Sequence, residues 1–506
     1  MFRKILVANR GEIAVRIIRT CREMGIATVA IYSDADREAK HVRLADEACA
    51  VGAAPPAESY LNIDRVLDAA GSAGANAIHP GYGFLSENAE FAQACEGAGI
   101  KFIGPPAAAI RSMGIKTRAR ELMSQAGVPV VPGTPEATDS RQAAALASQI
   151  GYPVMLKASA GGGGKGMRLV ESPAQLESAW EQAQGEALEA FGDGAVYLEK
   201  AILRPHHVEV QILADEHGAV VHLGERECSL QRRHQKVLEE SPSPLVEANP
   251  HVREQLYSAA IAAASAIGYA NAGTIEFLMD ADCRFYFLEM NTRLQVEHPV
   301  TELVTGMDLV KQQVRVAAGE TLGFSQEAVR FRGHAMECRV YAEDASANFM
   351  PSPGLIRRMA MPGGPGIRVD SGADEGWTVP IQYDPLIAKL CAWAPTRAEA
   401  IDRLRGALRE ATISGIATTL GFFRELMEDP QFQAGDIDTG FLARGIDPAA
   451  SAASAPSLEA RLAAVLAVIQ AEQGRAADQA SASLQPNSAW KRYGRIESVA
   501  ARGTER

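Results

Sequence analysis

Short apolar runs alternate with amphipathic segments over the first hundred residues of the chain. The apolar run 5–8 is followed by a glycine turn, by a segment with apolar positions at nearly helical spacing, and by the apolar run 28–32. Strand, turn, helix and strand in this order are typical of a right-handed βαβ unit in a parallel sheet. The runs 77–84 and 101–104 predict further strands of the same sheet. We therefore expect a first α/β domain that spans residues 1–113.

The pattern changes in the second hundred residues, where a predicted helix leads into a connector with prolines near both ends. Because proline fixes its backbone dihedral angle, the connector 128–133 predicts a stiff hinge. An apolar run, a glycine-rich segment at 161–166 and a further apolar run follow it. We expect a mobile, glycine-bearing lid subdomain at about 131–203, inside a second domain that spans 114–318.

Two apolar runs of the second domain each carry a glutamate, Glu276 in 273–278 and Glu289 in 284–289. The short segment between them predicts a β-hairpin, so both carboxylates come to the same end of the ribbon. Asn291 lies two residues beyond Glu289 and points to the same side if the strand continues. Carboxylate and amide oxygens are hard ligands that suit Mg²⁺ better than zinc. The alternative interpretation is a pair of solvated glutamates on an edge strand.

The run that follows this hairpin alternates polar and apolar residues, with Arg293, Gln295 and Glu297 on one face if the chain is extended. Arginine binds a planar oxyanion with two hydrogen bonds, glutamine adds another, and glutamate acts as a general base. An amphipathic strand with a solvent-facing salt bridge explains the same pattern. Pro299 ends the run.

Two further groups of residues have the composition of phosphate sites. Glycines at 161–166 let backbone amides approach phosphate oxygens, and Lys157 lies just upstream at the end of an apolar run. The spacing differs from the GxxxxGK[ST] phosphate loop, so a flexible surface turn is the alternative. The charged run 225–236 either supplies cations for phosphate or is a solvated face. The pair His206-His207 with Glu209 lacks a third ligand at metal spacing, which favours nucleotide contact or packing over zinc.

The last third of the chain mixes strands with helices. The run 335–341 predicts a strand and 397–411 predicts a helix of a third domain, which we place at 331–445. Residues 446–506 begin with many alanines and serines, so we expect a linker and one amphipathic helix there.

Composition narrows the remaining possibilities. The chain has 506 residues, of which 47% are hydrophobic and 22% are charged, as is typical of a globular protein with several cores. A net charge of -12 argues against a nucleic-acid or anionic-membrane surface. The seven cysteines are scattered without a CxxC pair, and the chain shows no secretory signal and no apolar span of about 20 residues. These features favour a cytoplasmic protein with reduced thiols.

Five motifs together indicate a family resemblance: ILVANRGEIA at 5–14, HPGYGFLSEN at 79–88, the glycine-rich segment, RRHQK at 232–236 and EMNTRLQVEH at 289–298. Over residues 1–445 the chain resembles biotin carboxylases, the ATP-grasp subunits of biotin-dependent carboxylases. The resemblance implies an α/β Rossmann-like N-terminal domain, an α+β ATP-grasp domain with a glycine-rich lid, and a mixed C-terminal biotin carboxylase domain.

The resemblance also implies roles for individual residues. Nucleotide contacts are implied for Lys116, Lys157, Gly163, Gly164, Glu199, Lys200, Ala201, Ile202, His207, Gln231, His234, Glu276 and Glu289. Ligation of Mg²⁺ or Mn²⁺ is implied for Glu276, Glu289 and Asn291, and contact with bicarbonate or biotin for Lys236, Arg293, Gln295, Val296 and Arg339. Glu297 is implied as the base that deprotonates bicarbonate, with Arg293 and Lys236 as the other catalytic residues.

By the same resemblance, bicarbonate attacks the γ-phosphate of ATP to give carboxyphosphate, whose CO₂ is captured by biotin. Relatives that carry their own biotin hold it in an Ala-Met-Lys-Met setting, whereas Lys491 stands in the sequence AWKRY. We therefore expect the biotin on a separate biotin carboxyl carrier protein, with carboxyltransferase subunits as further partners and a homodimer as the oligomeric state. Acetyl-CoA carboxylation in fatty acid biosynthesis is the expected role, although the acyl-CoA or 2-oxo acid is selected on another chain.

Two departures and three rival interpretations remain open. Ile115 stands where relatives have an acidic residue, and Ala160 opens the glycine-rich segment, so the affinity for ATP is not fixed by the resemblance. Another ATP-grasp carboxylate–amine ligase shares the metal ligands but does not need Arg293, Glu297 and Arg339 together. A non-catalytic nucleotide-binding assembly subunit needs no base at all. An NAD-dependent dehydrogenase is discounted because the first glycine turn lacks the GxGxxG spacing.

Overall fold

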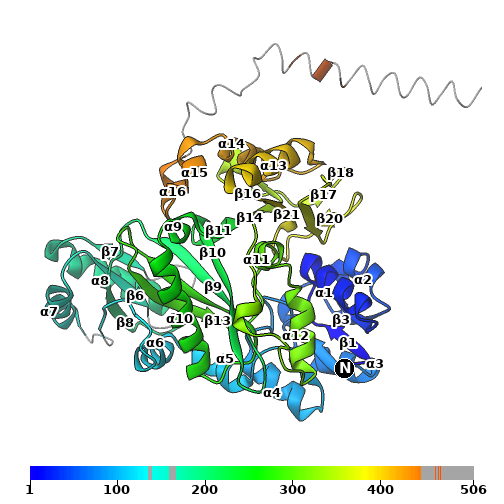
Figure 1. Ribbon diagram of the computed structural model, residues 1–506, viewed down its shortest axis with the longest axis horizontal. Helices are drawn as coiled ribbons and strands as arrows, with labels where there is room; N and C mark the ends of the chain where they lie inside the picture. Colours follow the sequence, from blue (N-terminus) through cyan, green and yellow to red (C-terminus); the bar gives the residue numbers. More distant parts are fainter. Residues whose placement is uncertain (135–138, 159–166, 446–461, 463–464, 467, 469–506) are drawn as a thin grey trace, which may run out of the picture. The chain divides into compact units, whose positions relative to one another are not determined.

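The computed structural model describes residues 1–134, 139–158 and 167–445, together with positions 462, 465, 466 and 468. The chain divides into two compact units, Met1–Ile446 and Asp447–Arg506, and the elements below belong to the first (Figure 1). The glycine-rich segment, with Ala160, Gly163 and Gly164, and nearly all of the expected linker and tail helix lie outside the described residues. No helix in the described part of the chain is long and apolar enough to span a membrane.

Five parallel strands form the N-terminal sheet, in the order β3-β2-β1-β4-β5. They are β1 (Lys4–Val7), β2 (Ala27–Ser33), β3 (Glu47–Gly52), β4 (Ala77–His79) and β5 (Lys101–Phe102). Its helices are α1 (Gly11–Glu23), α2 (Lys40–Leu44), α3 (Ile63–Ala73), α4 (Ala89–Gly97) and α5 (Ala107–Gly114). Ile13, Ile17 and Cys21 recur at helical spacing along α1 and are buried in one cluster with apolar side chains of β1. The predicted βαβ opening is confirmed.

The largest sheet in the described residues has eight antiparallel strands, in the order β13-β12-β9-β10-β11-β14-β21-β19. They are β9 (His206–Ala214), β10 (Val220–Arg232), β11 (Gln235–Ser241), β12 (Asn271–Met279), β13 (Phe285–Asn291), β14 (His334–Tyr341), β19 (Ile367–Ser371) and β21 (Leu386–Ala394). The pairing of β11 with β14 sets Leu238 opposite Cys338. One continuous sheet therefore crosses from the second expected domain into the third.

The strands β12 and β13 confirm the predicted hairpin. They pair antiparallel, and the register sets Glu276 directly opposite Glu289. Helices around this sheet are α9 (Pro244–Glu247), α10 (Pro250–Ala266), α11 (His298–Thr305) and α12 (Leu309–Ala317). The strand β13 reaches Asn291, as the expected placement of that residue requires. It ends there, so the extended conformation considered for residues 293–297 does not form, and α11 begins at His298 with Pro299 in its first turn. Proline suits that position because its missing N–H is not needed there.

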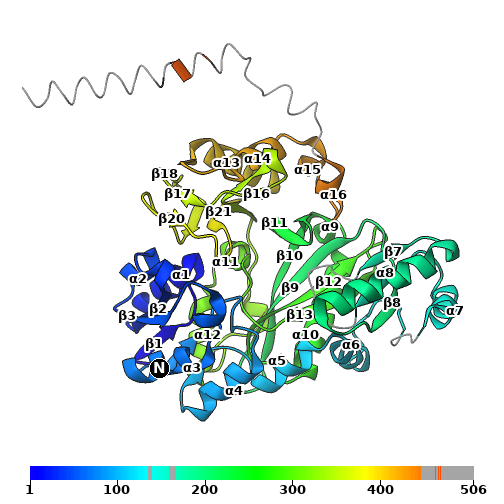
Figure 2. The same cartoon turned by 180° about the vertical axis from the view of Figure 1, so that it is seen from behind.

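A second, smaller sheet carries the residues between the expected hinge and β9. Its antiparallel strands β6 (Val154–Ala158), β7 (Arg168–Val170) and β8 (Val196–Lys200) lie in the order β7-β6-β8. The helices α7 (Ser140–Ile150) and α8 (Pro173–Phe191) cover it through a core that includes Trp180 (Figure 2). The helix α6 (Lys116–Gln125) precedes the connector, which bridges Val130 to Phe287 of β13 and Gly133 to Glu199 of β8.

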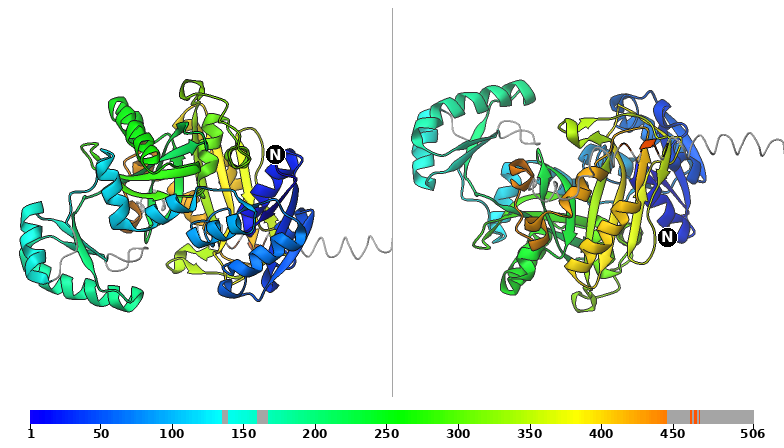
Figure 3. Two further views of the ribbon diagram at one scale, coloured as in Figure 1. Left: turned by 90° about the horizontal axis from the view of Figure 1, so that it is seen from below. Right: turned by 90° about the horizontal axis from the view of Figure 1, so that it is seen from above.

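The C-terminal part of the first unit packs helices on the strands β14 and β21. These helices are α13 (Arg397–Glu410), α14 (Leu420–Leu426), α15 (Pro430–Ala434) and α16 (Phe441–Arg444). Short strands complete this part: β15 (Glu343–Asp344), β16 (Met350–Pro351), β17 (Gly354–Leu355), β18 (Arg358–Ala360), β20 (Thr378–Val379) and β22 (Thr412–Ser414). Leu404 and Leu408 of α13 are buried against Leu390 of β21, and Figure 3 shows α13 lying across these strands.

Candidate active site

A cavity of about 260 Å³ opens between α6, the small sheet and β13. Lys116, Lys157 and Glu199 line it together with Glu289 and Asn291, so the structure brings together five residues that the sequence analysis names. Its other lining residues include Glu87, Arg120, Tyr197, Leu288 and Thr292. The cavity therefore has cations on one side and the acidic end of the hairpin on the other.

Glu199 is the common partner of two cations in this cavity. Lys157 and Arg120 both form ion pairs with its carboxylate, and Arg120 also donates a 2.9 Å hydrogen bond to the Val131 carbonyl of the connector. Burial and the positive charges of Lys116 and Arg120 lower the pKa of Lys157 to about 8. Crowded, desolvated cations of this kind favour an anionic ligand, since the ligand relieves their mutual repulsion.

The hairpin places two carboxylates and an amide at one end of the sheet. Burial and the charge of Glu276 raise the pKa of Glu289 above its ordinary value. Among the described residues no hydrogen bond or ion pair holds the Glu289 carboxylate, whereas Asn291 Nδ2 donates to Glu276 at 2.8 Å. Hard oxygen donors that repel each other fit a divalent cation such as Mg²⁺, and Glu276, Glu289 and Asn291 would hold such an ion here.

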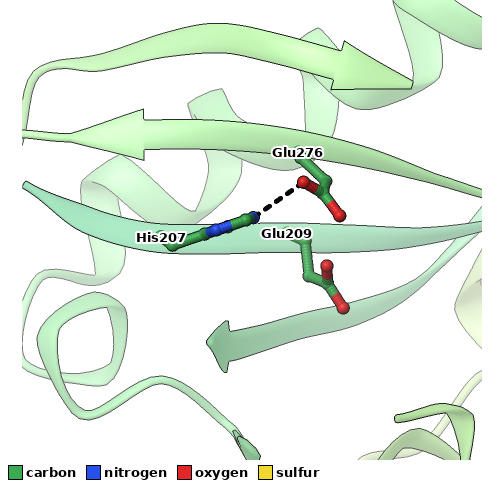
Figure 4. A group of neighbouring side chains, drawn as sticks. All are labelled: His207, Glu209 and Glu276. Atoms are coloured by element: carbon green, nitrogen blue, oxygen red, sulfur yellow. Dashed lines mark ion pairs between the residues drawn. The ribbon is translucent and has the colours of Figure 1, made fainter. Parts of the chain in front are cut away.

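Glu276 also belongs to a buried cluster of facing strands. The register of β9 and β12 sets Glu209 opposite Glu276 and His207 opposite Leu278. The His207 Nε2 atom lies 2.9 Å from a Glu276 oxygen, and all three side chains come within ligand distance of one ion (Figure 4). The structure thus supplies the third ligand that sequence spacing could not show. We assign no zinc here, because the Glu209 charge is already balanced by Arg226 and Lys236.

Lys236 forms hydrogen bonds with three carboxylates of this cluster. Its Nζ atom donates to Glu209 at 2.6 Å, to Glu276 at 2.7 Å and to Glu297 at 2.7 Å. Burial opposes the charge of this lysine, but the three carboxylates raise its pKa well above the ordinary value. Lys236, on β11, is the last residue of the charged run 225–236, and Arg226, on β10, is fully buried. The interpretation of 225–236 as a solvated face is therefore wrong for most of the run, because the facing strand supplies its counterions.

Glu297 is fully buried between two cations. One of its oxygens accepts from Lys236, and the other accepts from Arg339 Nη2 at 2.9 Å. Burial alone raises the pKa of a carboxyl group, yet the Lys236 and Arg339 charges hold the pKa of Glu297 below its ordinary value. Arg339 is itself fixed by a 2.6 Å bond from Nε to Glu239. Glu297 is therefore an ionised carboxylate in a dry environment, as a general base requires.

Arg293 donates hydrogen bonds to polar side chains within and around the segment 292–297. It donates to Gln295 Oε1 at 3.0 Å, to Asn291 Oδ1 at 2.8 Å and to Glu87 Oε2 at 2.7 Å. Gln295 in turn donates to Glu276 at 2.9 Å. The interpretation as an amphipathic strand with a solvent-facing salt bridge is wrong, since Gln295 and Glu297 are buried and the segment is irregular.

Several named residues lie apart from this group. Lys200 donates to the carbonyls of Gly151 and Tyr152 and does not line the cavity. His234 is exposed in the turn between β10 and β11, with a left-handed backbone, while Gln231 contacts His207. Ala201 donates a backbone bond to Pro153, and the Val296 carbonyl accepts from Lys389. Ile202 is half-buried beside Ala201.

Sequence reasoning missed four charged residues of the site, Glu87, Arg120, Glu239 and Lys389, and it named Arg226 only as part of the charged run 225–236. Glu87 falls within the motif at 79–88, which supports the family resemblance but was given no site role residue by residue. Arg120 lies one helical turn after Lys116, which placed it on the same face of the predicted helix. Lys389 carried no signal, because its partners come from distant segments.

Three known sequence families match consecutive parts of the chain. They are "Biotin carboxylase, N-terminal domain" over residues 1–110, "Carbamoyl-phosphate synthase L chain, ATP binding domain" over 116–325, and "Biotin carboxylase C-terminal domain" over 337–444. Among individual proteins, a biotin carboxylase of Nostoc sp. is 55% identical over 87% of this chain and 98% of its own length. A pyruvate carboxylase subunit from Methanothermobacter thermautotrophicus is 53% identical over 88% of this chain and 91% of its own.

Solved structures agree with these sequence matches. A Campylobacter jejuni biotin carboxylase, in complex with a β,γ form of ATP, is 49% identical with a TM-score of 0.84, over 88% of this chain and 99% of that one. The biotin carboxylase domain dimer of Hydrogenobacter thermophilus 2-oxoglutarate carboxylase, solved with MgADP, ADP and bicarbonate, is 51% identical with a TM-score of 0.83. That match covers 88% of this chain and 98% of the other.

Proposed function

The chain belongs to the biotin carboxylase family and is an ATP-dependent ligase, and from this premise we propose that it carboxylates biotin on a separate carrier protein as one component of an acetyl-CoA carboxylase. One observation carries the proposal: Glu297 is an ionised, buried carboxylate beside the cations Lys236 and Arg339, next to an acid-lined cavity with three cations. A base and a divalent-metal site in one enclosed cluster suit the activation of bicarbonate by ATP.

The proposed reaction begins with the two anionic substrates. Lys116 and Lys157 hold the phosphates of ATP, and Arg293 with Gln295 holds bicarbonate beside Glu297. Glu297 takes the bicarbonate proton, the bicarbonate oxygen attacks the γ-phosphorus, and ADP leaves. Glu276, Glu289 and Asn291 would hold a Mg²⁺ ion, which would offset the charge of the phosphates. Carboxyphosphate breaks down to CO₂ and phosphate, and the phosphate takes the ureido N–H proton of biotin. Arg339 orients biotin and the reacting anion, so that the biotin nitrogen captures CO₂ before water does.

Steady-state ATP hydrolysis tests this function directly. Hydrolysis should depend on bicarbonate and rise on addition of free biotin, with carboxybiotin as product. An ATP-grasp ligase for other carboxylates would ignore both additions, and a non-catalytic assembly subunit would hydrolyse nothing. Either result would overturn the proposal.

Acetyl-CoA is the proposed final acceptor of the carboxyl group. Relatives named for pyruvate and 2-oxoglutarate carboxylases match nearly as well as those named biotin carboxylase. Purification of the chain with its biotinylated carrier and transferase, followed by assays with acetyl-CoA, pyruvate and 2-oxoglutarate, separates these possibilities. Transfer to acetyl-CoA supports the proposed role in fatty acid biosynthesis, and transfer only to a 2-oxo acid contradicts it.

We also propose a cytoplasmic homodimer, supported by the dimer of the Hydrogenobacter thermophilus domain. Sedimentation of the full chain at micromolar concentration should give twice the chain mass of 53.9 kDa. A single monomeric species over that range would contradict it.

The low pKa of Lys157, about 8, gives a prediction for alkaline pH. The protonated lysine attracts phosphate, and this form is lost as the pH rises through that value. We therefore expect kcat/KM for ATP to fall about tenfold per pH unit above it, because kcat/KM reports groups of the free enzyme. In Lys157→Arg the decline of kcat/KM should begin at a higher pH, since arginine stays charged. An identical decline in both proteins would assign it to another group.

The metal assignment gives a second prediction. Glu289→Gln should raise the Mg²⁺ concentration for half-maximal ATP hydrolysis by at least about tenfold, because an amide replaces a charged ligand. Asp282→Asn is the matched control, since Asp282 is exposed in the turn of the same hairpin. Equal Mg²⁺ dependence of the two variants would show that Glu289 is not a ligand.

A further inference from the structure

The motif at residues 9–12, which opens α1, has no part in the reaction described above. Its Glu12 is buried in the first turn of the helix. One Glu12 oxygen lies 3.0 Å from the Nζ atom of Lys389 and also accepts a hydrogen bond from the Tyr82 hydroxyl. The start of α1 is tightly enclosed, because a Cβ added to Gly372 would lie 2.4 Å from the Glu12 nitrogen. The position of the Glu12 carboxylate is therefore closely fixed.

Lys389 connects this carboxylate with the segment that holds the base. It is fully buried on β21, and its Nζ atom donates a 2.8 Å hydrogen bond to the Val296 carbonyl. Burial opposes its charge, but Glu12, Glu337 and Asp370 raise its pKa, so the lysine stays a cation and a donor. A buried lysine is costly to the fold unless all its contacts are satisfied.

The hydrogen bond from Lys389 acts on the peptide next to Glu297. The Val296 carbonyl belongs to the peptide unit that joins Val296 to Glu297, so this bond fixes the backbone from which the base projects. The neighbouring strand fixes the other end of the base, since Arg339 lies opposite Lys389 in the β14–β21 register and binds the Glu297 carboxylate. The segment 292–297 has no regular structure of its own that would hold this peptide.

We propose that Lys389, anchored by Glu12, is a positioning residue that holds the 296–297 peptide and thereby aims Glu297 at bicarbonate. The inference rests on the proposed function only for the identity of the anion. It assigns a task to the N-terminal motif, which anchors the lysine that binds the backbone next to the base. Lys389 itself touches no substrate.

A charge-balanced double variant tests this role in the full chain. Lys389→Met with Glu12→Gln removes the donor to Val296 without leaving a buried charge in the pair. We expect kcat/KM for bicarbonate to fall about 10- to 100-fold, since small misplacements of a catalytic group have effects of this size. The KM for ATP should change less than about twofold, because the cavity that binds it is separate from this contact.

The matched control is Lys40→Met with Asp374→Asn. This pair also joins the N-terminal and C-terminal parts of the unit, with a 2.8 Å contact, but it lies outside the site. Its removal should leave both kinetic constants unchanged. If the test variant lost activity toward ATP and bicarbonate in equal measure, the role of Lys389 would be general stability and the proposal would fail.

Hydrogen–deuterium exchange provides a readout that does not depend on the reaction. Amides of residues 292–297 should exchange faster in the Lys389→Met, Glu12→Gln protein than in the control protein. Unchanged exchange would overturn the positioning role even if the wild-type chain is an active biotin carboxylase. Faster exchange in a chain whose wild type shows no bicarbonate-dependent hydrolysis would instead retain the positioning role and reject the proposed function.

Discussion

Replacing Glu297 with glutamine is expected to lower kcat for bicarbonate-dependent ATP hydrolysis by about 10²- to 10⁴-fold. Glutamine has nearly the same shape, and its carbonyl oxygen still accepts the hydrogen bond from Arg339, but an amide cannot take the bicarbonate proton. The carboxylate is fully buried and makes 2.7 and 2.9 Å contacts with Lys236 and Arg339. We therefore expect the fall in kcat to come mainly from the loss of the base and not from unfolding.

The pH dependence provides an internal check on this assignment. Burial tends to raise the pKa of Glu297, but Lys236 and Arg339 hold it below its ordinary value. The wild-type base is consequently ionised at neutral pH and is protonated only on strong acidification. The rate of the wild-type enzyme should not decline near neutrality because of this group.

Two measurements distinguish the loss of this base from a loss of substrate binding or of folding. The affinity for ATP should be unchanged in Glu297→Gln, and Glu327→Gln, which alters an exposed carboxylate, should behave as wild type. If the Glu297 variant kept wild-type kcat, the proton would be taken by another group and the assignment would be wrong.

The parts of the site that depend on local sequence were predictable. The turn between the two apolar runs is short, so the hairpin and the facing of Glu276 and Glu289 followed from turn length and alternation alone. The βαβ opening followed in the same way from hydrophobic spacing. In each case the residues that determine the element lie within about one hairpin or one helix of each other.

The charged interior was not predictable by the same reasoning. A run of charges on one strand is normally solvated, and nothing within 225–236 shows that Glu209 lies opposite Arg226. That contact arises from the pairing of β9 with β10, and the contact between β11 and β14 joins residues about a hundred positions apart. Buried ion pairs are decided by long-range strand register, which a single sequence does not reveal.

The segment 292–297 shows a second reason why the sequence did not predict the geometry of the site. Its alternation of polar and apolar residues suggests a strand, yet the segment is irregular and Glu297 contacts Lys236. Residues 292–297 lie between the end of β13 and the start of α11 at His298, and Gln295 and Glu297 are buried there. Alternation therefore identified which side chains act together but not the backbone that brings them together.

Replacing Lys236 with methionine is expected to destabilise the protein by about 3–5 kcal/mol and to abolish bicarbonate-dependent hydrolysis. Methionine fills a similar volume, but Glu209, Glu276 and Glu297 lose the cation that all three contact within 2.7 Å. Three buried carboxylates that share fewer counterions repel one another, and their desolvation is no longer compensated. Urea denaturation at pH 7 measures the loss of stability, and Lys101→Met provides the contrast, because that half-exposed lysine pairs with a single surface carboxylate.

The sign of the pH dependence distinguishes charge repulsion from poor packing. In the wild type, burial tends to raise the pKa of Glu209, but the charges of Arg226 and Lys236 outweigh it and hold this pKa at about 2. The ionised Glu209 therefore contributes to stability at neutral pH, and this contribution is lost only as the pH falls through that value. Without Lys236 the pKa values of these carboxyl groups should be raised. The variant should therefore lose most stability at pH values where the carboxyl groups are ionised, and it should regain stability as they are protonated. The stability difference between wild type and Lys236→Met should therefore shrink between pH 7 and pH 5. A difference that stays constant over this range would mean that methionine disturbs packing, and that Lys236 does not serve as the counterion of the cluster.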